Sequence, residues 1–310
     1  MAPTILQSAA TALINMSFAV IVGVLASRLW LARGMSAWRE PALAKLSFAL
    51  AAGLATCAIG TMLSLWLGAA AMADVPRFAA APAVWTMLAA THYGHAGVLA
   101  LVLLVLAGIA HASRMKSMDS ARYDRALAAC VLSLALVRVT IGHAFGYGPF
   151  SVAVWFQWCH VLLTALWAGS VMVSGWIVLP CAMSGKSSPG TTTAAYLTAL
   201  SRWATFALLG ILATGAYHAY LVLESPRDLL GSEYGLVLSV KLCFVLAAIG
   251  LGGFNRFIGL PAVLAPGKPD ADTQDGLRLV IAVLRVEAIV LLIVLTAAAV
   301  LTGSVPPTSA

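Results

Sequence analysis

Residues 278–302 read RLVIAVLRVEAIVLLIVLTAAAVLT, an apolar run of 25 residues that contains only three charged side chains. A helix needs roughly 20 mostly apolar residues to cross the hydrocarbon core of a bilayer. The stretch is therefore predicted to form a transmembrane helix, and the question becomes how many more of the 310 residues behave in the same way.

The whole chain has the composition of a membrane protein. Hydrophobic residues make up 62% of it, charged residues make up 9%, and the mean hydropathy is +0.97. Soluble domains contain about 45–50% apolar and about 25% charged residues. We therefore predict an all-α polytopic membrane protein in which residues 1–310 form a single transmembrane domain without a soluble appendage.

Apolar stretches of spanning length recur along the sequence, and an even number of them places both termini on one side of the membrane. We predict eight spans, at about 9–31, 46–70, 85–112, 126–148, 153–179, 197–223, 235–259 and 278–302.

Basic residues are distributed unequally between the two sets of loops. The connections after spans one, three, five and seven, with their flanks, hold 14 Lys and Arg residues, whereas the opposite loops hold only Arg77 and Arg227. Cytoplasmic loops carry an excess of Lys and Arg, so both termini are predicted to be periplasmic. The net charge of +7 is then a topology signal and gives no indication of nucleic-acid binding.

Five of the six histidines are predicted to lie at one depth near the outer face, although four spans carry them. Measured from Trp85, the first two lie 7 to 10 residues into span three, or roughly 10–15 Å deep. Ionisable side chains inside a bilayer are costly and usually face the bundle interior, where they mark ligand sites or pathways. The five residues are His92, His95, His143, His160 and His218.

Neutral imidazole is the commonest metal ligand in proteins, and sulfur ligands are predicted at similar depths. Cys159 adjoins His160, and Met16 and Met62 belong to spans one and two. Imidazole combined with thiolate or thioether favours copper over magnesium, calcium or manganese. The residues thus predict a copper site with the sulfur atoms as secondary candidates. The sixth histidine, His111, is predicted to be an interfacial side chain at the cytoplasmic end of span three.

Three further charged residues fall inside predicted spans. Arg138 and Glu287 are expected near mid-membrane, where we predict that they are neighbours or share a polar network. Lys241 lies closer to the outer face, where its side chain can reach the headgroups, repel cations or pair with a carboxylate.

From about residue 142 to 306 the chain resembles the CopD family of bacterial inner-membrane copper resistance and copper uptake proteins. The order and spacing of short elements across four spans carry this resemblance, and Cys159 and Trp203 depart from the usual pattern. The elements are Gly142-His143-Ala144, His160, Trp167-Ala168-Gly169, Arg202-Trp203, Thr214-Gly215, Tyr234-Gly235 with Lys241, Asn255-Arg256, Leu277-Arg278, Glu287, Thr296-Ala297 and Pro306.

The resemblance implies a multi-pass protein of the bacterial inner membrane that accepts copper on the periplasmic side and passes it inward. It also implies a periplasmic copper carrier of the CopC type as a partner, besides membrane lipid. His143 and His160 carry over by motif, whereas His92, His95 and His218 depend on the depth prediction.

Two other functions remain open at this point. Histidines at one depth also suit a b-type cytochrome in which two imidazoles hold haem iron, although only His111 is available for a second haem near the inner face. A copper-binding assembly factor or sensor would carry the same ligands without transport. No P-loop, HExxH or GxSxG pattern is present, so an enzyme is not expected.

Overall fold

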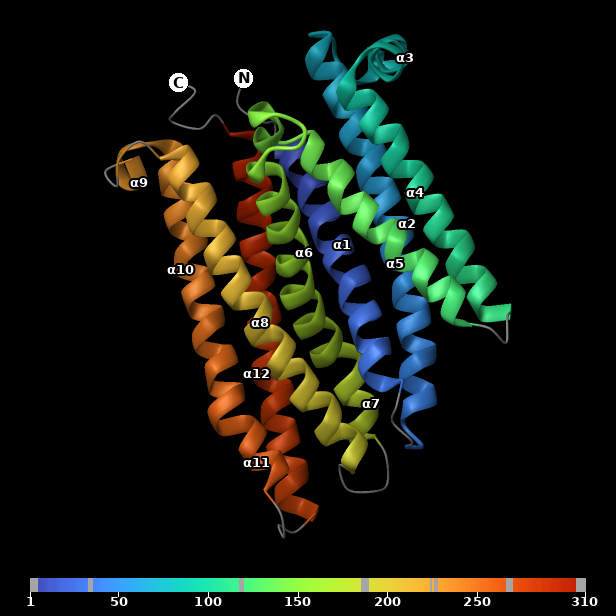
Figure 1. Cartoon of the computed structure of the whole chain (residues 1–310), viewed down its shortest axis with the longest axis vertical. Coiled ribbons are helices and arrows are strands. Elements are labelled where there is room, and N and C mark those ends of the chain that lie inside the picture. Colours follow the sequence, from blue (N-terminus) through green and yellow to red (C-terminus); the bar gives the residue numbers. More distant parts are fainter. Residues whose placement is uncertain are drawn as a thin grey trace.

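A computed structural model describes residues 5–32, 36–116, 120–184, 190–223, 225, 228–265 and 270–304. The side chains of residues 120, 143, 270 and 271 lie outside this description. Within the described ranges the chain forms helices and no strands, and the long helices lie side by side in one elongated bundle (Figure 1). The all-α prediction is therefore confirmed.

Eight of the described helices contain 21 residues or more, and short helical segments connect several of them. The long helices are α1 (Ile5–Leu31), α2 (Arg39–Met72), α4 (His92–Lys116), α5 (Ser120–Thr140), α6 (Val152–Val173), α8 (Thr191–Val222), α10 (Glu233–Phe254) and α12 (Asp270–Gly303). The short segments are η1 (Arg77–Ala79), α3 (Ala81–Ala90), η2 (His143–Tyr147), η3 (Ser174–Val178), α7 (Leu179–Met183), α9 (Asp228–Gly231), η4 (Asn255–Gly259) and α11 (Leu260–Leu264).

Seven helical segments in the described chain are long and apolar enough to cross a membrane. They confirm seven of the predicted spans, and many large apolar side chains on their outer surfaces are exposed, as lipid contact requires. The remaining predicted span corresponds to α5. This helix runs beside α4 (Figure 1) but does not qualify as a span, because Arg122, Asp124 and Arg125 occupy its start and Arg138 its end.

The helix ends define two ends of the bundle. Helix α1 begins and α12 ends at the same end, which we call the N/C end (Figure 1). The opposite end, which we call the basic end, carries most of the arginines that lie at helix termini. Among them are Arg28, Arg39, Arg114, Arg125 and Arg256.

The structure corrects the start of predicted span three. The helix breaks at Thr91, whose backbone is extended, and Thr91 Oγ1 accepts a hydrogen bond of 2.9 Å from the Gly94 amide. A threonine that bonds the amide three residues on is an N-cap, so α3 and α4 are separate helices. His92 and His95 consequently lie at the very start of α4, and the depth predicted for them along one continuous helix is wrong.

The end of predicted span four is also corrected. Helix α5 ends at Thr140, and residues 143–147 form the separate 3₁₀ segment η2. Gly148 adopts a φ of 109°, in the left-handed region that favours glycine, and Pro149 follows it. These two residues turn the chain into α6, so His143 belongs to a connecting segment at the N/C end instead of a spanning helix.

Two prolines produce the irregular segments near the basic end. Pro180 and Pro261 lack an amide hydrogen, and a proline ring inside a helix clashes with the carbonyl four residues earlier. Pro180 lies two residues after the end of the π-helical segment η3, and Pro261 lies two residues after the end of the π-helical segment η4. The chain therefore widens its helix for one turn before each proline and then continues in the same direction.

Helix α6, which carries His160, is fixed by a very close crossing with α1. A Cβ atom added to Gly23 would collide with the backbone of Gly169, and one added to Gly169 would collide with the Ala19 carbonyl. Small residues permit such close approach between membrane helices. Farther along, the buried Tyr196 hydroxyl lies 2.9 Å from Ser27 Oγ and 2.8 Å from Ser174 Oγ, which links α1, η3 and α8.

Candidate metal centre

His160 and His218 come together between two antiparallel helices at the N/C end. His160 lies about 12 Å along α6 from its start and His218 about 6 Å from the end of α8, at 1.5 Å per residue. Their ring centroids are 6.1 Å apart and the ring planes are inclined by 76°. Gly215 lies against the His160 ring, because a Cβ atom there would be 3.4 Å from His160 Cε1, at van der Waals contact.

The hydrogen bonds of Thr214 determine the tautomer of His160. Thr214 Oγ1 lies 2.7 Å from the carbonyl oxygen of Gly210, to which it donates its hydrogen. It also lies 2.8 Å from His160 Nδ1, so it must accept from a protonated Nδ1. In neutral imidazole the other ring nitrogen then carries a lone pair. His160 Nε2 is therefore in the form that binds a metal.

His218 presents the same nitrogen. Its Nε2 is buried and has no hydrogen-bond partner among the described residues. An imidazole holds a metal at about 2 Å, which places the centroids of two rings that share one ion about 5 Å apart at a tetrahedral ion and about 6 Å apart when the two nitrogens lie on opposite sides of it. The observed separation of 6.1 Å corresponds to the second arrangement.

A positive charge stands beside the pair. Lys241 on α10 is close enough to act electrostatically on both rings. Of the roles predicted for it, repulsion of cations is the one that this position allows directly. A metal ion bound here would experience the same repulsion unless the ammonium group moved away or lost its proton.

The other predicted histidines contact different parts of the chain. His92 donates from Nε2 to the Thr140 carbonyl at 3.2 Å and stacks on Phe145 with centroids 5.0 Å apart. His95 donates to the Ala89 carbonyl at 3.1 Å. Both therefore bond the ends of neighbouring helices, α5 and α3, and neither is brought to the His160–His218 pair. The side chain of His143 lies outside the described part of the chain.

The predicted sulfur ligands are not assembled around the two rings. Cys159 is exposed, Met62 is 51% exposed, and Met16 packs half-buried against the main hydrophobic core. Among the described residues no group of three or more His, Cys, Asp or Glu side chains is placed to hold one ion. The two imidazoles are thus the ligand set that the described residues provide, and any further ligand must join on binding.

The three buried charges have separate partners. Arg138 donates to Asn15 Oδ1 and its guanidinium lies 5.3 Å from the centre of the Phe18 ring. Glu287 is 2% exposed and accepts a hydrogen bond of 3.1 Å from Trp167 Nε1. No hydrogen bond described for Arg138 reaches Glu287, and Lys241 lies with the histidine pair.

Two features of these sites were missed by sequence reasoning. Thr214 precedes His218 by four residues on α8, so the two share a helix face, and this spacing could have identified Thr214 as part of the site. The second is a cavity of about 280 Å³ among α6, α8, α10 with η4, and α12, which Glu287 and Trp167 help to line. No local sequence pattern predicts a cavity between four helices.

Residues 194–301 match the protein-family model CopD, described as copper resistance protein D. The match covers α10 and most of α8 and α12, includes His218, Lys241 and Glu287, and lies within the region from about 142 to 306 where the resemblance was predicted. Neither the comparison with curated proteins nor the comparison with solved structures gave a match. Together with its long apolar helices, the match makes this chain a multi-pass membrane protein whose segment 194–301 is similar to the CopD copper resistance family.

Proposed function

We propose that this protein binds copper between His160 and His218 at the N/C end of the bundle and passes it toward the cytoplasm across the bacterial inner membrane. The single observation that carries the proposal is the pairing of two imidazoles whose Nε2 atoms are both available. The CopD match supports copper as the metal, and soft or borderline nitrogen ligands suit it.

The proposed orientation places the N/C end in the periplasm and counts α5 as an eighth crossing. Helix α1 begins and α12 ends at the same end of the bundle (Figure 1), which requires an even number of crossings. The arginines at the opposite end agree with the excess of basic residues in cytoplasmic loops. Copper would then enter from the side on which a periplasmic carrier of the CopC type delivers it.

The cavity beside Glu287 supplies a proposed continuation of the path. Helices α6, α8 and α10 hold the histidine pair and Lys241, and these helices with α12 also form the walls of the cavity farther toward the basic end. Its buried carboxylate is a group that can receive a cation in a low-dielectric region. Transport would be driven by a gradient or by transfer between proteins.

A b-type cytochrome is the competing function, because two axial imidazoles that share a haem iron also need centroids about 6 Å apart. Metal analysis and an absorption spectrum of the detergent-purified full-length protein, before and after copper loading, separate the two. Bound copper without a Soret band supports the proposal, whereas a Soret band without copper overturns it. Copper uptake into proteoliposomes then distinguishes a transporter from a binding protein without flux.

Removing the Thr214 hydroxyl should weaken copper binding by about 10–100-fold, as expected for the loss of a group that orients a metal-binding imidazole. In Thr214→Val the side chain keeps its shape, but His160 Nδ1 loses its acceptor and the ring is free to change tautomer. Copper titration of the purified variant measures the effect. Thr198→Val on the same helix is the matched control, because that hydroxyl bonds only the Ala194 carbonyl; an equal affinity in both variants would contradict the tautomer argument.

Replacing Lys241 with Leu should strengthen copper binding by on the order of tenfold, because a neighbouring positive charge is removed and no new ligand is introduced. Equilibrium competition with a copper chelator measures the change in the dissociation constant. The control is Lys45→Leu, which removes an exposed lysine near the start of α2. Weaker binding in Lys241→Leu would mean that the amine is itself a ligand.

A further inference from the structure

The basic end of the bundle contains a buried arginine without a counter-ion. Arg28 on α1 is 7% exposed, and no carboxylate of the described residues lies within ion-pair distance of it. Its Nη2 donates to Ser47 Oγ at 2.9 Å, whereas its Nη1 is buried and has no partner. A buried charge without a partner is strongly unfavourable, so this position calls for an anion from outside the chain.

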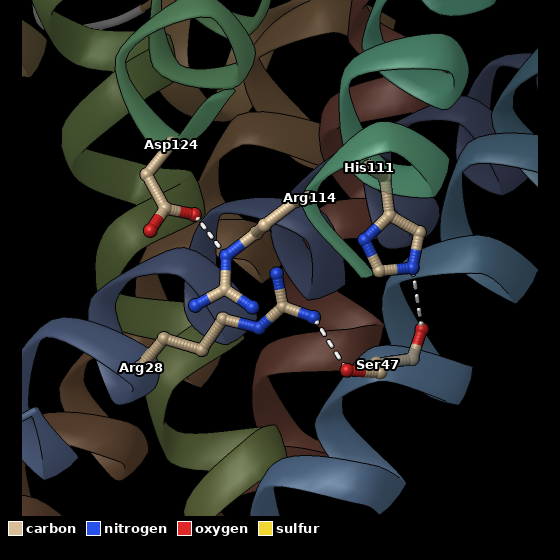
Figure 2. Close-up of polar contacts among 5 residues, drawn as sticks. All are labelled: Arg28, Ser47, His111, Arg114 and Asp124. Atoms are coloured by element: carbon tan, nitrogen blue, oxygen red, sulfur yellow. Dashed lines mark hydrogen bonds and ion pairs between the residues drawn. The ribbon is translucent and has the colours of Figure 1, made fainter. Parts of the chain in front are cut away.

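A second unpartnered nitrogen points into the same space. His111 on α4 is 8% exposed, and its Nε2 must donate to the Ser47 carbonyl, 3.1 Å away, because a carbonyl only accepts. The other nitrogen, Nδ1, then carries a lone pair, and it too is buried without a partner. Figure 2 shows Arg28 Nη1 and His111 Nδ1 turned toward the region beside the Arg114 guanidinium.

The charges around this region do not balance. Arg114 on α4 donates from Nε to Asp124 Oδ1 of α5 at 2.5 Å, so the only carboxylate of the cluster is already paired. Arg114 and Asp124 both act electrostatically on Arg28, and the effect of Arg114 is the larger. The cluster thus contains two guanidinium groups and one carboxylate (Figure 2). With His111 neutral, it has one positive charge in excess.

We propose that Arg28, His111 and Arg114 bind a hydrogen phosphate group. Such a group carries both functions that the cluster lacks: a charged oxygen that accepts from Arg28 Nη1, and a P–OH that donates to His111 Nδ1. A phosphodiester or sulfate ion has no such hydroxyl and would leave His111 unpaired. Water could bond both nitrogens but would leave the excess charge uncompensated.

The site lies within one turn of helix ends. Arg28 is three residues before the end of α1 and Arg114 two residues before the end of α4. The side chains of Arg114 and Asp124 are 24% and 37% exposed, so the cluster opens on their side. Hydrogen phosphate can therefore come from the aqueous phase as inorganic phosphate or from the membrane as a monoester headgroup such as phosphatidate.

The test uses the full-length protein and two sources of the ligand. In detergent, sodium phosphate and sodium sulfate are titrated at equal pH and ionic strength, with binding followed by calorimetry and by the thermal unfolding midpoint. In nanodiscs, retention of phosphatidate is compared with retention of phosphatidylcholine by native mass spectrometry. Saturable binding of phosphate at least tenfold tighter than sulfate, or selective retention of phosphatidate, is expected and identifies the source.

Variants connect the binding to this cluster. Arg28→Gln and His111→Phe should each weaken binding at least tenfold, whereas Arg125→Gln, which removes an exposed arginine near the start of α5, should leave it unchanged. The comparison of phosphate with sulfate needs no variant, so misfolding of Arg28→Gln would not prevent a decision. Equal effects of the two anions together with no selective retention of phosphatidate would overturn the proposal. Copper binding at the opposite end is not involved in any of these measurements.

Discussion

Replacing either His160 or His218 with Ala should reduce bound copper in the purified protein to background. Each variant leaves one imidazole, and no group of three metal-binding side chains exists in the described chain to compensate for the loss. Loss of a group that merely orients a ligand costs about 10–100-fold in affinity, so loss of the ligand itself should cost more than a hundredfold. Metal analysis after copper loading and desalting measures the stoichiometry.

The matched control for this experiment is His95→Ala. His95 also lies at the N/C end, but its ring donates to the Ala89 carbonyl at 3.1 Å and does not join the pair. Its replacement should leave the copper stoichiometry unchanged. Normal copper content in both His160→Ala and His218→Ala would rule out the pair as the binding site, whereas loss in His95→Ala alone would move the site to the start of α4.

Adding one methyl group at Gly169 should destabilise the folded protein by about 3 kcal/mol, near the upper range for overpacking a tight core. The new Cβ would collide with the Ala19 carbonyl, and the facing residue of α1, Gly23, already approaches the Gly169 backbone. Both partners are backbone atoms, so the collision is relieved only by moving a whole helix. Thermal or denaturant unfolding of Gly169→Ala in detergent measures the loss.

Gly250→Ala provides the control for the helix crossing. A Cβ atom at Gly250 on α10 would have no heavy atom within 4 Å, and alanine favours a helix over glycine by up to about 1 kcal/mol. This variant should be as stable as the wild type or slightly more stable. If Gly169→Ala unfolded at the same midpoint as Gly250→Ala, α1 and α6 would not be held as closely as described.

Much of the fold could be predicted because it depends on local composition. A run of about 20 apolar residues is sufficient to specify a membrane helix, and seven of the eight predicted spans are helices that meet this requirement. The exception, α5, begins with Arg122, Asp124 and Arg125, which lie before the predicted window of 126–148 and were therefore left out of the apolar count. The helix breaks at Thr91 and after Thr140 depend on single capping or turn residues, which a window average does not register.

Several residues of the candidate sites could also be predicted, but their grouping could not. The sequence predicted His160 from a motif as well as from depth, and placed His218, His92 and His95 with it from estimated depth alone. Depth along a helix does not determine the direction in which a side chain points. In the structure the rings of His92 and His95 point to backbone carbonyls of α5 and α3. Arg138 and Glu287 were likewise predicted together from their depth, but their side chains bond Asn15 and Trp167.

The amino-acid sequence by itself therefore determined the membrane class, the spanning segments and the resemblance of the C-terminal part to the CopD family. These properties are sums over consecutive residues. Only the tertiary structure decided that His160 faces His218, that Thr214 fixes a ring nitrogen, and that Arg28 lies buried without a counter-ion. Such pairings arise where helices cross, and the crossings depend on close contacts such as that of Gly23 with Gly169, between residues far apart in the chain.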